Sequence, residues 1–90
     1  MPVTLIAEVP ALTEDVYGGM IQNLKPRLQA ADGFIAHSGG PSPNGGWRVV
    51  EIWDTEEQAQ TWFEANVRPN LPDGVVPDRQ FYEAHTAFGG

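Results

Sequence analysis

One stretch of the chain, residues 33–67, constrains the fold more than any other part of the sequence. It contains a short apolar segment, a loop rich in glycine and proline, a second apolar segment from Trp47 to Trp53, and a run with helical spacing. Thr55 and Gln58 have the spacing of a capping box, which marks the start of a helix. The stretch therefore predicts a strand, a loop, a strand and a helix. The loop is short enough for the two strands to be antiparallel partners.

The flanking segments extend this pattern on both sides. Val3 to Val9 is rich in β-branched residues and ends before Pro10, which predicts a first strand. Thr13 is the expected N-cap of a first helix, because apolar residues then recur every three or four positions. That helix face carries Val16, Tyr17, Met20, Ile21, Leu24 and Leu28. The other expected segments are a strand at Phe34–Ser38, a loop at Gly39–Gly46, a helix face with Ala59, Trp62, Phe63 and Val67, a loop at Asn70–Asp78 and a last strand at Gln80–Ala87.

The resulting order is βαββαβ, which is typical of the ferredoxin-like α+β folds. In these folds an antiparallel sheet has two helices on one face. Residues 1–90 are expected to form one domain, since a chain of this length holds a single core.

Both faces of the predicted sheet carry apolar side chains. In the strand from Trp47 to Trp53, Val49 alternates with Val50 and Ile52, so large apolar groups point in both directions. An antiparallel sheet with one wet face would show polar residues on that face. Because two helices cover only one face, we expect a homodimer in which the other faces of two sheets meet.

The charge and composition exclude several classes of function. The net charge is −7, and the five basic residues are scattered along the sequence, so neither nucleic acid nor an anionic membrane surface is an expected partner. There is no cysteine to form disulfides or thiolate sites. No apolar run is long enough to span a membrane and no basic signal-peptide start is present, which predicts a cytoplasmic protein.

The segments Gly33–Ile35 and Trp47–Ala59, together with the βαββαβ order, resemble the antibiotic biosynthesis monooxygenase-like proteins of the dimeric α+β barrel superfamily. The resemblance covers nearly the whole chain. It implies a dimeric α+β barrel with a cavity in each subunit that takes a small hydrophobic aromatic ligand. The family includes cofactor-independent oxygenases of aromatic polyketides, haem-degrading enzymes and small proteins without an assigned activity.

The haem-degrading branch can be compared residue by residue. Trp62 resembles the helix tryptophan that shapes the haem pocket in that branch. The branch has an asparagine where this chain has Ala7-Glu8, and its iron-binding histidine lies in a region that here reads Asn66 to Leu71 without a histidine. Haem degradation is therefore disfavoured, and no cofactor is predicted.

His37 is the candidate catalytic residue. It lies in a predicted strand between the small residues Ala36 and Ser38, which leave room for a ligand. An imidazole there can accept a phenolic proton at neutral pH. The alternative is a core or interface histidine with a satisfied hydrogen bond.

The candidate substrate-binding residues are mostly aromatic. They are Tyr17, Trp53, Trp62, Phe63 and His85. The alternative interpretation is that these residues pack the core. Glu51 is a lone acid in the strand from Trp47 to Trp53. It could be a base in a cavity, but the expected role is pairing with an arginine such as Arg48 or Arg68, within the chain or across the dimer. No metal site is predicted, because His37, His85 and Glu51 lack close ligand spacing.

The function that these observations and the resemblance favour is a cofactor-independent monooxygenase acting on a small aromatic, polyketide-like compound. Two alternatives stay open on the same dimeric scaffold. One is a non-catalytic ligand-binding or accessory protein, and the other is an isomerase or cyclase.

Overall fold

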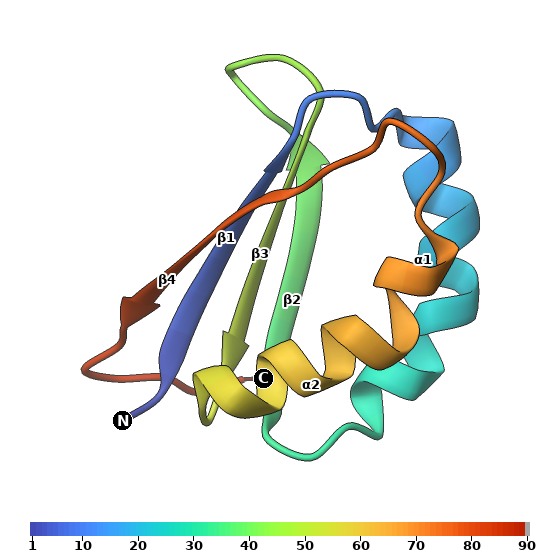
Figure 1. The fold of residues 1–90 in the computed structure, drawn as a ribbon. Helices are drawn as coiled ribbons and strands as arrows, with labels where there is room; N and C mark the ends of the chain where they lie inside the picture. Colours follow the sequence, from blue (N-terminus) through green and yellow to red (C-terminus); the bar gives the residue numbers. More distant parts are fainter. Residues whose placement is uncertain (90) are drawn as a thin grey trace.

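Four strands form one antiparallel sheet in the computed structural model, which describes residues 1–89 (Figure 1). The strands are β1 (Val3–Val9), β2 (Phe34–Pro41), β3 (Trp47–Trp53) and β4 (Asp78–Glu83), in the order β2-β3-β1-β4. β1 is central: it pairs with β3 from Val3↔Trp53 to Val9↔Trp47 and with β4 along its other edge. The predicted ferredoxin-like α+β fold is confirmed.

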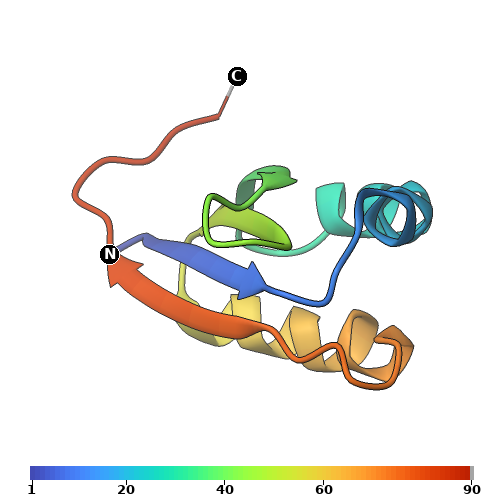
Figure 2. The same cartoon turned by 90° about the horizontal axis from the view of Figure 1, so that it is seen from above.

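Two helices, α1 (Glu14–Gln29) and α2 (Glu56–Asn66), lie on one side of the sheet (Figures 1 and 2). Both predicted N-caps are present: the hydroxyls of Thr13 and Thr55 accept hydrogen bonds from the N–H groups three residues later, at 3.3 and 3.1 Å. A short 3₁₀ turn, η1 (Arg68–Asn70), follows α2. Within residues 1–89, neither helix combines the length and apolar character that crossing a bilayer requires.

The core between helices and sheet consists of two apolar clusters. The first is built from Ala7, Val9, Leu12 and Trp47, with Tyr17 packed against it. The second is built from Leu28, Trp53 and Ala59, with Phe34 and Trp62 packed against it. Trp53 has no exposed surface, so it is the centre of the second cluster.

Three strand boundaries predicted from the sequence are wrong: the end of the second strand and both ends of the last one. The expected loop at Gly39–Gly46 is shorter, because Gly39, Gly40 and Pro41 extend β2 and pair with β3. The remaining turn is closed by Ser42, whose N–H donates to the carbonyl of Gly46 at 3.0 Å.

The last strand begins at Asp78 instead of Gln80 and ends at Glu83 instead of Ala87. The reason for the earlier end is the length of its partner: Glu83 pairs with Val3, where β1 begins, so the following residues have no strand to pair with.

A bulge in β2 changes which side chains face the helices. Phe34 pairs with Trp53 and Ala36 with Ile52, which leaves Ile35 as an extra residue in the ladder. Strict alternation would place Phe34 and His37 on opposite faces. With the bulge, both share the face of Trp53 and Glu51, under the helices.

The cap of α2 gives a test of how this helix is held. Thr55→Ala is expected to destabilise the protein by about 1 kcal/mol, because the N–H of Gln58 loses its acceptor. In a domain of this size that loss lowers the melting temperature by about 4–8 °C. Thr61→Ala, at an exposed position in the middle of α2, is the control and keeps or slightly raises the melting temperature. Equal melting temperatures for both variants would contradict the cap.

Candidate active site

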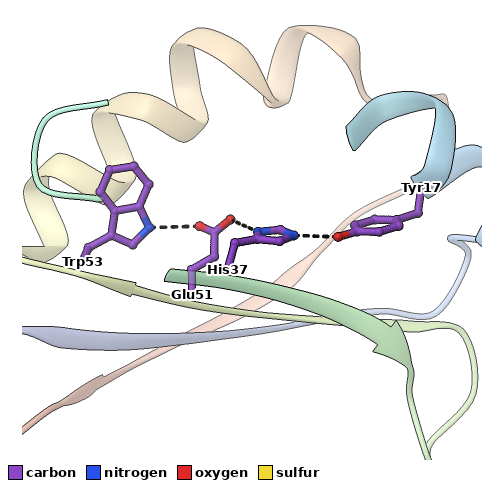
Figure 3. Close-up of polar contacts among 4 residues, drawn as sticks. All are labelled: Tyr17, His37, Glu51 and Trp53. Atoms are coloured by element: carbon purple, nitrogen blue, oxygen red, sulfur yellow. Dashed lines mark hydrogen bonds and ion pairs between the residues drawn. The ribbon is translucent and has the colours of Figure 1, made fainter. Parts of the chain in front are cut away.

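A series of four side chains runs between the sheet and the helices, joined by hydrogen bonds (Figure 3). The hydroxyl oxygen of Tyr17, on α1, lies 2.6 Å from Nε2 of His37, on β2. Nδ1 of the same imidazole lies 2.7 Å from Oε2 of Glu51 on β3. The other carboxylate oxygen accepts a hydrogen bond from the indole of Trp53 at 2.9 Å. We refer to these four residues as the polar series.

Glu51 fixes the protonation pattern of this series. Its side chain is 10% exposed, and as a carboxylate it can only accept hydrogen bonds. The Nδ1–H group of His37 therefore donates to Glu51. When the imidazole is neutral, its Nε2 is then the free base and accepts from the Tyr17 hydroxyl. In this arrangement a carboxylate orients and supports an imidazole whose second nitrogen is the basic one.

The prediction that Glu51 pairs with Arg48 or Arg68 is wrong within one chain. Arg48 lies on the other face of β3 and binds Glu8, and Arg68 binds Glu64 one helical turn away at 2.7 Å. Register explains this outcome: His37 and Glu51 are directly opposite in the β2–β3 ladder, whereas Arg48 points away from the helices.

A cavity of about 90 Å³ lies beside the polar series. Its walls are mostly apolar side chains from both helices and from β1 and β3, while Tyr17, His37, Glu51 and Arg79 contribute polar groups. The apolar lining residues include Leu5, Ala7, Val9, Met20, Ile21, Leu24, Val49, Trp62, Phe63 and Leu71. The polar groups are therefore few and concentrated, which is the usual composition of a small-molecule site.

The position of the Tyr17 hydroxyl depends on the glycine at position 39. A Cβ atom at Gly39 would lie 2.4 Å from that hydroxyl, so any side chain there would displace the phenol from His37. Burial raises the pKa of Tyr17 above its ordinary value of 10.0, and the nearby charge of Glu51 raises it further. The phenol is thus held neutral, with its proton directed at the imidazole.

The structure brings four of the six predicted site residues together. His37, Tyr17, Trp62 and Phe63 all line the cavity. Trp53 is completely buried and is not part of the cavity wall, and it reaches the site only through its hydrogen bond to Glu51.

His85 is placed differently from the sequence-based expectation. It follows β4 instead of lying in a strand, is exposed, and has a hydrogen bond to Thr86 at 2.7 Å. It is not among the residues that line the cavity.

Sequence reasoning set Glu51 aside as a site residue in favour of an arginine pair, and it missed Arg79. A lone acid in an apolar strand was the signal for Glu51, although its partner could not be read from spacing. Arg79 had a weaker signal. It lies two residues before Phe81, so both side chains are on the inner side of β4.

Comparison with solved structures shows which proteins have this fold. SnoaB, a cofactor-independent oxygenase from Streptomyces nogalater, superposes with a TM-score of 0.67 at 9% identity over 96% of this chain and 95% of that one. A candidate monooxygenase from Shewanella loihica PV-4 superposes with a TM-score of 0.60 at 19% identity over 96% of both chains. The haem-free form of a haem-degrading protein from Mycobacterium tuberculosis superposes with a TM-score of 0.56 at 21% identity over 100% of this chain and 98% of that one.

No family model matches the sequence, and no curated protein matches it either. At these identities the likeness establishes the fold. The resemblance to the antibiotic biosynthesis monooxygenase-like proteins is therefore confirmed at the level of the fold.

The raised pKa of Tyr17 can be measured directly. In a Tyr82→Phe background, Tyr17 is the only tyrosine, so absorbance at the phenolate band follows it alone. We expect its pKa above 10.0, with circular dichroism recorded alongside to show that the protein is still folded.

Glu51→Gln in the same background removes the negative charge near the phenol. The pKa of Tyr17 is then expected to fall, while burial keeps it above 10.0. Glu57→Gln, at an exposed position on α2, is the matched control and leaves it unchanged. An equal shift in both variants would show that Glu51 does not act on Tyr17 at close range.

Proposed function

We propose that this protein is a cofactor-independent monooxygenase that acts on a small phenolic or polyketide-like aromatic compound. The observation that carries the proposal is the Tyr17–His37–Glu51 part of the polar series, which borders a mostly apolar cavity. The fold shared with SnoaB, a cofactor-independent oxygenase, supports the same assignment.

The first step is removal of a proton from the bound compound. Nε2 of His37 already accepts from Tyr17, so the phenolic oxygen of Tyr17 receives the substrate proton as its own proton passes to the imidazole. The carboxylate of Glu51 stabilises the imidazolium that forms. The result is a substrate anion in an apolar cavity.

The electron-rich anion then reduces molecular oxygen, which is the co-substrate. For an anthrone, the ring CH₂ carbon forms a bond to one oxygen atom, and the O–O bond of the resulting peroxide breaks. That carbon becomes a ketone, and the second oxygen atom leaves as water with the two hydrogens that the carbon has lost. Trp62 and Phe63 are the aromatic walls we propose to hold the flat substrate.

The size of the cavity sets a condition on this reaction. At about 90 Å³ it is smaller than the roughly 300–1,000 Å³ of ordinary ligand pockets. Binding of a fused-ring compound therefore requires side chains of the helix wall, such as Met20 and Leu71, to move outward.

The residues present do not fit a haem site. His37 is the histidine that lines the cavity, and both of its ring nitrogens are engaged, by Tyr17 and by Glu51. Within residues 1–89 no group of three His, Asp or Glu side chains is arranged to hold a metal ion.

Two rival functions use the same cavity. A ligand-binding or accessory protein would use the shape and the polar groups of the cavity to bind a ligand, but would not convert it. An isomerase or cyclase would use the same proton transfer from Tyr17 to His37 without consuming oxygen.

Oxygen consumption separates these functions. Metal-stripped protein with a panel of anthrones and naphthoquinols is expected to consume oxygen faster than autoxidation, and to lose this activity on heat denaturation. Tyr17→Phe and His37→Ala are expected to lower kcat by about 100-fold or more, because each interrupts the proton transfer. Tyr82→Phe removes a hydroxyl from the other face of the sheet and is the matched control, with unchanged kcat.

Flat oxygen traces together with measurable ligand binding would replace the monooxygenase by the binding protein or the isomerase. Product formation without oxygen uptake would identify the isomerase or cyclase.

We also propose that two copies associate through the outer faces of their sheets. On this face Ile6 lies opposite Val50, Ile52 is only partly buried, and Tyr82 is 52% exposed. A second copy related by two-fold symmetry would cover this apolar strip with an identical one.

Light scattering at micromolar concentration tests the association. The wild type is expected to have twice the mass of one chain, and Val50→Asp is expected to be monomeric, because a charge would be placed at the centre of the interface. Val76→Asp changes an exposed valine in the loop before β4, and this control stays dimeric. A monomeric wild type would contradict the proposal.

A further inference from the structure

We propose that the compound bound in this cavity carries a carboxylate, and that Arg79 recognises it. The inference deepens the proposed function by naming the substrate class: a flat aromatic acid with a hydroxyl group at its far end. It rests on the cavity as the ligand site, and it does not depend on whether oxygen is consumed.

The side chain of Arg79 extends from β4 to α2, where it contacts Phe63 and Gln60. Its side chain is among those that line the cavity. The guanidinium carbon lies 3.8 Å from the ring centroid of Phe63 and 5.3 Å from that of Phe81. Two aromatic contacts hold the planar group in one orientation, as a preorganised binding group requires.

Within residues 1–89, the guanidinium of Arg79 has no carboxylate partner. Among residues 1–89, the arginines that form ion pairs are Arg48, with Glu8, and Arg68, with Glu64. Arg79 donates one hydrogen bond, to the side-chain oxygen of Gln60, out of the five that a guanidinium can donate. Its remaining donors can bind a carboxylate in the two-bond geometry that arginine favours.

Burial removes water from the positive charge of Arg79. Burial lowers the pKa of Arg79, and the charge of Arg68 adds to this effect, while the negative charges of Glu51, Glu64 and Glu56 oppose it. The chain as a whole has a net charge of −7, so an anionic ligand would be repelled without a local cation. Arg79 is the arginine among the residues that line the cavity.

The strand register places Arg79 in line with the Tyr17 hydroxyl. Gly39 pairs with Val49, Val49 with Ala7, and Ala7 with Arg79, so these four residues form one row across the sheet. The Tyr17 hydroxyl lies over the Gly39 end of that row. Three strand spacings separate the ends of the row by roughly 14 Å at the backbone.

Between these two ends the cavity floor is made of the small side chains of Val49 and Ala7. Arg79 reaches inward from one edge strand, while Tyr17 and His37 lie at the other edge. A two-ring compound that lies across the strands would place its hydroxyl at Tyr17 and its carboxylate at Arg79. The same geometry fixes which end of the substrate is deprotonated.

Isothermal titration calorimetry with two probes of equal shape tests this inference. The probes are 6-hydroxy-2-naphthoate and its neutral amide, 6-hydroxy-2-naphthamide. The wild type is expected to bind the acid at least about tenfold more tightly, because hydrogen bonds to a charged partner are worth that much. Arg79→Met is expected to abolish this preference while its affinity for the amide stays near that of the wild type.

Arg68→Met is the matched control. It removes the same charge close to Phe63, but from an arginine that is paired with Glu64 and does not line the cavity. Its preference for the acid is expected to be that of the wild type. Arg79→Lys, which keeps the charge without the planar group, is expected to keep part of the preference.

Three results would overturn the inference: equal affinity of the wild type for acid and amide, no binding of the acid, or a parallel loss of both affinities in Arg79→Met. The last result would mean that Arg79 only packs on the aromatic rings. If Arg79→Met is unfolded by circular dichroism, the comparison of wild type with Arg79→Lys decides the matter. A wild type that prefers the acid but consumes no oxygen would refute the monooxygenase and leave this inference standing.

Discussion

A carboxylate inside an apolar core needs hydrogen-bond donors on both oxygens, and Glu51 meets this requirement with His37 and Trp53. The hydrogen bonds that this carboxylate requires determine how the side chains of the interior are arranged. It fixes the imidazole of His37 against β3, the imidazole in turn fixes the phenol of Tyr17, and the phenol connects α1 to the sheet. The same contacts leave an imidazole nitrogen and a phenolic hydroxyl at the cavity wall, so the groups that satisfy the buried charge are also the ones suited to proton transfer.

The polar series connects the two apolar clusters of the core. Tyr17 packs against the cluster around Trp47, with ring centroids 5.1 Å apart, and Trp53 is the centre of the other cluster. The site is thus part of the core and not a surface addition. Replacing Glu51 by an apolar residue would leave two buried donors without acceptors, and stability and chemistry would change together.

Local patterns in the sequence were sufficient for the fold. Both helix caps, the strands and their order follow from residue spacing, and the structure agrees. What could not be predicted depends on pairing across the sheet. Glu51 was expected beside an arginine because opposite charges attract, but its partner is set by register, which placed His37 opposite it. The loop at Gly39–Gly46 was overestimated because glycine and proline usually mark turns, whereas here two of the glycines pair as strand residues. The position of His85 depends on where β1 begins, which lies far away in the sequence.

The bulge at Ile35 has a consequence for how this site could be gained or lost in evolution. In a regular strand, inserting or deleting one residue moves every following side chain to the opposite face. Here Ile35 is the residue without a partner on β3, so its deletion would leave Phe34, Ala36 and His37 in regular alternation and keep His37 opposite Glu51. A chain of the present length without the bulge would instead turn His37 outward, while the sheet, helices and turn could all persist. The inward position of the histidine therefore depends on the bulge and on the spacing from Phe34 to His37 together, and sequences of this fold have to be compared at both.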